Sequence, residues 1–211
     1  MVTLYLVRHG QTECSRDSRF CGAGVDVPLL PVGEEMAEAL VDRYGDERWE
    51  AIYASPMIRA RQTAAPLAAK TKLDVRVEPG LREIDYGAWE SFLEADVKAK
   101  SPKAYEDWTR DPGRLAPPGG ESGEAIAARA MPVVDAIRER HSGNVFAVSH
   151  KGTIRVIICA LLGIDLSLYR SRIGQPVSAV TVFEFRPTGP HMRTMGDTSH
   201  LDARLRAELD A

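Results

Sequence analysis

The sequence predicts an α/β fold with a largely parallel central sheet. Short apolar segments of strand length alternate with longer segments whose apolar residues recur at helical spacing, as in 36–44. In addition, two strand-like segments end alike: 4–7 runs into Arg8-His9-Gly10, and 145–148 runs into Ser149-His150-Lys151. Ligands of such folds bind at the carboxyl ends of the strands, so the pattern predicts the place of a site as well as the fold.

Length and charge exclude several classes of protein. The 211 residues are 44% hydrophobic and 27% charged, which suits one domain with a core of normal size. The formal net charge is −3 and no Lys/Arg block occurs, so we expect no nucleic-acid partner and no membrane partner. No apolar stretch reaches the roughly 18 residues of a membrane span, and the first residues lack the pattern of a signal peptide. We therefore expect a cytoplasmic protein.

The cysteines fit that expectation. Cys14, Cys21 and Cys159 are odd in number and lack the spacing of a metal site. In a cytoplasmic protein the simplest interpretation is that all three are reduced thiols.

The expected elements follow in order along the chain. A loop is expected over 10–31, and a helix begins with Ser55 as N-cap and Pro56 at the first helical position. Pro66 and Pro132 are expected to kink their helices. Short helices and a loop over 88–120 are expected to cover one edge of the core, and 202–211 to form a helical or frayed tail. The strands are expected at 3–7, 51–54, 75–77, 144–149, 179–185 and 191–195, and the helices at 32–41, 55–70, 122–140 and 153–162.

Cations join the two strand-end histidines. Arg59 lies in the first turn of the helix predicted after Ser55, where the macrodipole favours an anion. A bound anion removes this conflict and uses the unpaired N–H groups of that turn. Arg8 offers a second guanidinium, and guanidinium groups match phosphate oxygens in pairs.

A carboxylate completes the set. The segment 81–87 follows the third strand and carries Glu83 and Asp85. Imidazole, guanidinium and carboxyl groups at one sheet edge predict phosphoryl transfer. A neutral imidazole attacks phosphorus, arginines offset charge on its oxygens, and a carboxylic acid protonates the leaving oxygen.

Five motifs in order resemble those of the histidine phosphatase superfamily. They are R-H-G-Q-T-E at 8–13, S-P-M-I-R-A-R-Q-T-A at 55–64, L-R-E-I-D-Y-G at 81–87, G-G-E-S at 119–122 and V-S-H at 148–150. The resemblance implies a three-layer α/β/α sandwich with a mostly parallel sheet, of the phosphoglycerate-mutase-like type. It further implies a single domain over 1–211 with a covering insertion at about 88–120.

The resemblance also implies roles for individual residues. His9 is expected to be the phosphohistidine nucleophile and Glu83 the proton donor. Arg8, Arg59 and His150 are expected to form the phosphate pocket. Members of the family typically need no metal, and we expect no cofactor.

Two positions depart from the family pattern. Ser15 stands where many members have an Asn that touches the phosphate, and Lys151 stands where most have Gly. We expect both to bind phosphate, although Lys151 is also compatible with contact to another acidic group of the substrate, and equally with a solvated rim position. Glu83 is preferred to Asp85 as the acid because of the motif match.

The resemblance covers both phosphatases and mutases. The mutase-like Arg-Arg pair is absent from 97–105, and the acid motif reads Leu81-Arg82-Glu83, so we favour hydrolysis. The expected enzyme is a metal-independent phosphomonoesterase acting on a small phosphorylated metabolite such as phosphoserine, a phosphoglycerate derivative or a sugar phosphate. The alternatives are a cofactor-dependent phosphoglycerate mutase and a non-catalytic phosphate-binding module. A homodimer is a compatible assembly.

The covering segment is expected to meet the leaving group. Trp108 and several cations lie in it, and His200 offers a further polar group, which is expected at the surface. The cations are Lys98, Lys100, Lys103, Arg110 and Arg114.

Overall fold

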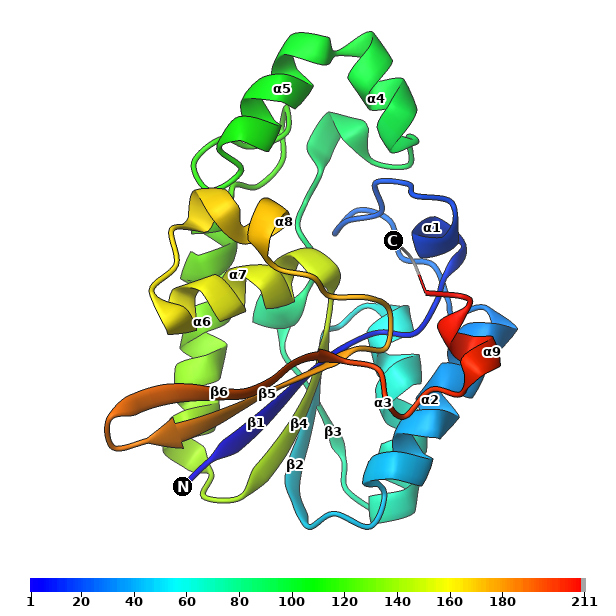
Figure 1. Cartoon of the computed structure of the whole chain (residues 1–211), viewed down its shortest axis with the longest axis vertical. Helices are drawn as coiled ribbons and strands as arrows, with labels where there is room; N and C mark the ends of the chain where they lie inside the picture. Colours follow the sequence, from blue (N-terminus) through cyan, green and yellow to red (C-terminus); the bar gives the residue numbers. More distant parts are fainter. Residues whose placement is uncertain (210–211) are drawn as a thin grey trace.

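The computed structural model describes residues 1–209 and shows, over that range, a six-stranded sheet between two layers of helices (Figure 1). The strand order is β3-β2-β4-β1-β5-β6; β1 to β4 run parallel to one another, β5 pairs antiparallel with β1, and β6 pairs antiparallel with β5. The predicted α/β/α sandwich with a mostly parallel sheet is confirmed. The strands are β1 (Thr3–Arg8), β2 (Trp49–Ala54), β3 (Val75–Val77), β4 (Asn144–Ser149), β5 (Val180–Arg186) and β6 (Gly189–Asp197).

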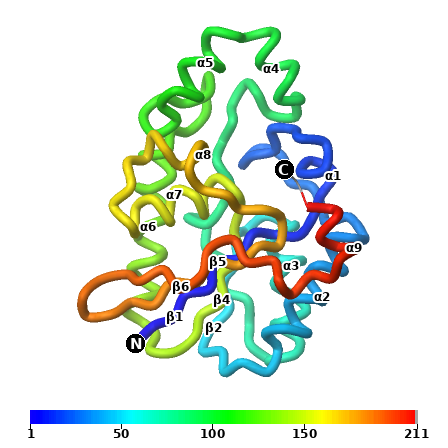
Figure 2. Tube along the Cα trace, in the orientation of Figure 1, coloured from blue at the N-terminus to red at the C-terminus, as the bar shows by residue number. Residues whose placement is uncertain are grey.

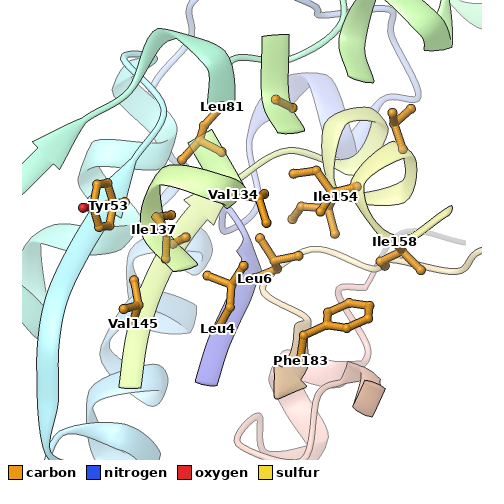
Figure 3. Close-up of a cluster of buried hydrophobic side chains, with 14 of the residues drawn as sticks. Leu4, Leu6, Tyr53, Leu81, Val134, Ile137, Val145, Ile154, Ile158 and Phe183 are labelled. Atoms are coloured by element: carbon orange, nitrogen blue, oxygen red, sulfur yellow. The ribbon is translucent and has the colours of Figure 1, made fainter. Parts of the chain in front are cut away.

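Alternation along the central strand divides the core between the two faces of the sheet. Leu4 and Leu6 of β1 pack with α6 (Gly123–Arg140) and α7 (Lys151–Leu162), as Figure 3 shows for part of this cluster. Tyr5 and Val7 lie on the opposite face with α2 (Pro31–Tyr44) and α3 (Ile58–Thr71). Because side chains of a strand alternate in direction, one apolar strand serves both layers and is buried on both sides.

The start of α3 differs from the prediction. The helix begins at Ile58, with Met57 as N-cap, so Ser55 and Pro56 precede it. The Ser55 hydroxyl accepts a hydrogen bond from Met57 N at 3.3 Å and also forms a hydrogen bond with His150. It therefore takes part in a tertiary contact as well as in the turn. Elsewhere boundaries shift little: the helix predicted over 122–140 is α6, which has Ser122 as its N-cap and runs through Pro132 to Arg140.

The loop over 10–31 contains a one-turn helix and a disulfide. In α1 (Glu13–Arg16), Thr12 caps the helix. Cys14 and Cys21 are joined by a disulfide, so the expectation of three reduced thiols is wrong for this pair, whereas Cys159 is a free, buried cysteine. Thiol pairing depends on how the loop folds back on itself, which the spacing of the cysteines alone does not reveal.

The segment 88–120 docks on this loop through aromatic residues. It contains α4 (Glu94–Lys100) and α5 (Pro102–Arg110), which lie at the top of Figures 1 and 2, beyond the end of the sheet. Phe20 of the loop packs with Trp89, Val97 and Trp108 of the segment. Backbone hydrogen bonds from Phe20 to Phe92 and from Ser91 to Phe20 fasten the two together.

Short elements complete the chain. Among residues 1–209, no helix is long and apolar enough to cross a membrane. The predicted C-terminal tail contains one helical turn, α9, and its last two residues, 210–211, lie outside the described residues. The remaining elements are the 3-10 helices η1 (Pro79–Leu81), η2 (Gly87–Trp89) and η3 (Leu166–Leu168), with α8 (Tyr169–Arg172) and α9 (Ala203–Arg206).

Candidate active site

Two neighbouring strands bring the predicted histidines together. In the parallel pairing of β1 with β4, Arg8 lies opposite Ser149, so His9 and His150 follow at the same edge of the sheet. Their ring centroids are 5.1 Å apart, and both side chains are buried. The two imidazoles that the sequence predicts for one site therefore lie next to each other at this edge of the sheet.

A backbone carbonyl selects the tautomer of His9. Its Nδ1 lies 2.7 Å from the carbonyl oxygen of Gly10. Since a carbonyl only accepts, Nδ1 carries the proton in this hydrogen bond, and Nε2 of the neutral ring has the lone pair. Gly10 is itself held by its N–H, which donates to Thr63 Oγ1 at 3.0 Å.

His150 is kept neutral by its surroundings. Its Nε2 is 2.7 Å from the Ser55 hydroxyl, and Nδ1 is buried with no hydrogen-bond partner among residues 1–209. Burial, followed by the charges of Arg59, His9 and Arg8, holds the pKa of His150 well below its usual value. A neutral imidazole donates from only one nitrogen, so the Ser55 contact determines which nitrogen remains for a ligand.

The two predicted arginines are buried beside the histidines. Arg8 donates from Nη1 to the carbonyl of Gln175 at 2.8 Å. Arg59 donates to the carbonyls of Val25 and Cys21 and lies 3.7 Å from Asp26. Burial lowers the pKa of Arg59, the charge of Glu83 opposing this. The loop over 10–31 thereby fixes the direction of the Arg59 side chain.

Backbone amides of α7 hold the carboxylate of Glu83. Oε2 accepts from Gly152 N at 3.2 Å, and Oε1 accepts from Thr153 N at 3.2 Å and from Ile84 N at 2.9 Å. Asp85, the rival acid, accepts instead from Gly87 N within its own turn. Glu83 is thus the acid of this segment that lines the site.

Arg129, which was not predicted from the sequence, holds the segment that carries Glu83. Arg129 of α6 donates to the carbonyls of Gly80, Arg82 and Glu83, and pairs with Glu121 at 3.0 Å. Arg129 lies on a face of α6 that has no unusual pattern of residues. Nothing in the neighbouring sequence therefore predicts its contact with the distant segment 80–83.

The remaining predicted site residues also line the pocket. Ser15 forms a capping box with Thr12: its hydroxyl accepts from Thr12 N at 2.9 Å, and its N–H donates to Thr12 Oγ1. Lys151 is half-buried at the first position of α7. The geometry thus places both at the site, with the Ser15 hydroxyl already engaged in the turn.

The pocket has a volume of about 180 Å³, and the fully buried His150 is not among the residues that line it. Its outer wall differs from expectation, because none of the five cations predicted from the covering segment lines it among the described residues. Lys103 and Arg110 pair with Asp107, and Arg114 pairs with Asp111 and Asp165. Nothing local in the sequence identifies the residues that take their place: Arg19, Phe20, Tyr86, Glu94, Arg155, Tyr169 and Arg170.

His200 lies behind the site. Its Nε2 is 3.1 Å from the Ser178 hydroxyl, and Ser178 N donates to the carbonyl of His9. It is half-buried, so the expected surface position is wrong. Within residues 1–209, no group of three or more His, Cys, Asp or Glu side chains is arranged to hold a metal ion.

Comparison with known proteins agrees with this geometry. Residues 4–198 match the model of the histidine phosphatase superfamily (branch 1). Phosphoserine phosphatase 1 of Hydrogenobacter thermophilus is 35% identical over 172 residues, 81% of each chain. Glucosyl-3-phosphoglycerate phosphatase of Mycolicibacterium vanbaalenii is 33% identical over 171 residues, 77% of this chain and 75% of the relative.

Solved structures show the same fold. YhfR of Bacillus stearothermophilus superposes with a TM-score of 0.88 at 28% identity, covering 96% of this chain and all of the other. A mycobacterial glucosyl-3-phosphoglycerate phosphatase in complex with VO3 gives a TM-score of 0.85 at 29% identity, covering 93% and 99% of the two chains. The chain therefore belongs to the histidine phosphatase superfamily and is a phosphatase.

Proposed function

We propose that the protein is a metal-independent phosphomonoesterase that acts through a phosphohistidine at His9. The observation that carries the proposal is that His9 lines a pocket together with Arg8, Arg59 and Glu83, while the fully buried ring of His150 lies 5.1 Å from the His9 ring. Nucleophile, cationic donors and a carboxyl group then surround one phosphoryl group.

In the first step, the Nε2 lone pair of His9 attacks phosphorus while the bond to the leaving oxygen breaks. The leaving oxygen takes its electron pair and receives a proton from Glu83. Arg8, Arg59 and Nδ1 of His150 donate to the phosphoryl oxygens. The hydrogen bond from His9 Nδ1 to the Gly10 carbonyl stabilises positive charge on the phosphorylated ring.

In the second step, Glu83 acts as the base. It removes a proton from water, whose oxygen attacks phosphorus, and the phosphorus–nitrogen bond breaks. His9 regains its lone pair, Glu83 its proton, and inorganic phosphate leaves. The balance requires no redox partner and no metal ion.

The substrate is a small phosphorylated metabolite. The pocket volume of about 180 Å³ favours a compact molecule. Relatives are named for phosphoserine and for glucosyl-3-phosphoglycerate, so phosphoserine, phosphoglycerate derivatives and sugar phosphates are the candidates. In this proposal, residues 1–211 act as one domain whose segment 88–120 covers the pocket, while cytoplasmic location and assembly stay predictions.

Phosphate release from these esters and from p-nitrophenyl phosphate, with and without a chelator, tests the proposal. We expect release that is unaffected by chelation, and its loss in His9→Ala. Glu83→Gln should lower kcat by roughly 10²- to 10⁴-fold. His191→Ala, an exposed histidine of β6, is the control. Mass spectrometry of acid-labile phosphate should place the intermediate on His9.

Two results would contradict the proposal. One is undiminished turnover in a folded His9→Ala variant. The other is phosphate transfer between hydroxyls of an acceptor without release, which would identify a mutase.

A further inference from the structure

Arg155 is a pocket cation that the proposed chemistry does not use. It lies four residues after Lys151 in α7, so the two side chains share one face of the helix, and both line the pocket. Arg155 is half-buried, and its Nε is inaccessible to solvent. Within residues 1–209, its guanidinium makes no hydrogen bond and no ion pair.

The other outer arginine is already engaged. Arg170 stacks on the ring of Trp108 at 3.9 Å and lies 3.4 Å from Glu94. Arg155 makes no ion pair with the described residues, and burial together with the charges of Arg8 and Arg170 lowers its pKa, the charge of Glu83 opposing this. Leaving a guanidinium partly desolvated without an acceptor is unfavourable, so the fold holds Arg155 ready for an anion.

The position of Arg155 suits the leaving group and not the phosphoryl group. Arg155 lines the pocket together with Tyr86, Tyr169 and Arg170, none of which takes part in the proposed phosphoryl chemistry. The phosphoryl group already has Arg8, Arg59 and His150. A second anion reaching Arg155 therefore belongs to the ester's other end.

A carboxylate is the anion that fits one guanidinium. Its single charge matches that of Arg155, and its two oxygens match the fork of the guanidinium. A second phosphate would carry about two charges at neutral pH, and the neighbouring Arg170 is paired with Glu94. The buried ring of Tyr169 and the half-buried ring of Tyr86 line the same wall, which suits a short carbon skeleton between the two anions.

We propose that Arg155 binds the carboxylate of the substrate's leaving group, so that the enzyme selects phosphomonoesters of short hydroxy acids over their uncharged analogues. This inference rests on the phosphatase function proposed above. It assigns to Arg155 a role in substrate choice, separate from the phosphoryl chemistry at His9.

The test compares esters that differ by the carboxylate. Phosphoserine is paired with phosphoethanolamine, and 3-phosphoglycerate with glycerol 3-phosphate. Because a charge-assisted hydrogen bond is lost, we expect the wild type to prefer the carboxylated member, and Arg155→Met to reduce that ratio of kcat/KM about tenfold or more, mainly through KM. Arg155→Lys should retain part of the preference.

Arg172→Met is the matched control, because Arg172 is an exposed cation at the end of α8 and lies outside the pocket lining. Equal loss for both members of each pair, a wild type without preference, or the same change in Arg172→Met would overturn the inference. If Arg155→Met does not fold, the wild-type preference and its reduction in Arg155→Lys decide the matter. Failure of the phosphatase proposal looks different, since no ester, including p-nitrophenyl phosphate, would then release phosphate.

Discussion

At the scale of single residues, one hydroxyl determines what His150 can offer a ligand. If the Ser55 hydroxyl donates to Nε2 at 2.7 Å, the proton of the neutral ring lies on Nδ1, the buried nitrogen without a partner in the described part of the chain. Nδ1 can then donate to a phosphoryl oxygen. Ser55 is therefore a positioning residue, because it acts through His150.

Ser55→Ala should lower kcat by about 10- to 100-fold, since a buried hydrogen bond that orients a charge-stabilising donor is worth roughly 1–3 kcal/mol. The measurement is kcat together with the ¹⁵N shifts of His150, which report its tautomer. Ser149→Ala is the control: Ser149 is equally buried, but its hydroxyl donates to the Leu81 carbonyl. Normal kcat with an altered tautomer would contradict the assigned role.

Residues next to strand ends could be predicted, whereas residues that reach the pocket from helix faces could not. His9, His150 and Glu83 follow β1, β4 and the turn after β3, and the sheet edge collects them. Arg155 and Arg170 lie within helices, and which helical face meets the pocket depends on how α7 and α8 pack. Sequence spacing alone carries no information on that packing.

At the scale of elements, the start of α7 packs closely against the segment that carries Glu83, and Gly152 lies at the contact. A Cβ on Gly152 would lie 2.8 Å from Glu83 Oε1 and 3.2 Å from Ile84 Cγ2. The near atom is the tip of a flexible side chain, so the carboxylate can move aside at low cost in stability. It would then lose its contacts with the α7 amides.

Gly152→Ala should therefore fold with nearly unchanged Tm yet lose about tenfold or more in kcat, because a shift of the order of 1 Å misplaces the proton donor. Thermal unfolding and steady-state kinetics measure the two effects. Gly174→Ala is the control, since a Cβ there meets no atom within 4 Å. A large fall in Tm, or unchanged kcat, would show that Glu83 is not displaced as argued.

The loop over 10–31 shows why loops are harder to predict than strands. The apolar pattern marks its ends, but its conformation depends on Thr12 capping α1, on the disulfide from Cys14 to Cys21, and on Phe20 packing under Trp108. All three features depend on contacts with residues that the apolar pattern of the sequence does not identify. The same reason explains the displaced start of α3, because Ser55 makes its tertiary contact with a residue 95 positions away.

At the scale of the whole molecule, the layered fold follows from the pattern because both faces of the sheet are buried. The strands β1 and β4 are continuous apolar runs, as central parallel strands are, and the helices carry one apolar face each. The sheet order was not predictable, because pairing of β1 with both β4 and β5 joins segments more than 100 residues apart.

Global stability should fall as the pH drops below about 6.5, because the fold keeps several histidines neutral. Burial lowers the pKa of His141, holds that of His150 well below its ordinary value, and lowers that of His200 to about 4. The unfolded chain takes up these protons near pH 6.5 and the folded chain only at lower pH. Each such histidine therefore reduces the free energy of unfolding by up to ~1.4 kcal/mol per pH unit in this interval.

Carboxylates are a smaller influence between pH 7.5 and 5.5, so urea unfolding in that range isolates the histidines. Glu90 opposes the trend, since burial raises its pKa and the folded state then binds its proton more tightly. His200→Gln should flatten the slope of unfolding free energy against pH, because the half-buried ring near Asp197, Arg206 and Arg43 no longer titrates. His191→Gln, an exposed site, should leave the slope unchanged. Equal slopes in the wild type and His200→Gln would mean that His200 takes up its proton as readily folded as unfolded, and the fold would then not exclude charge from the region behind His9.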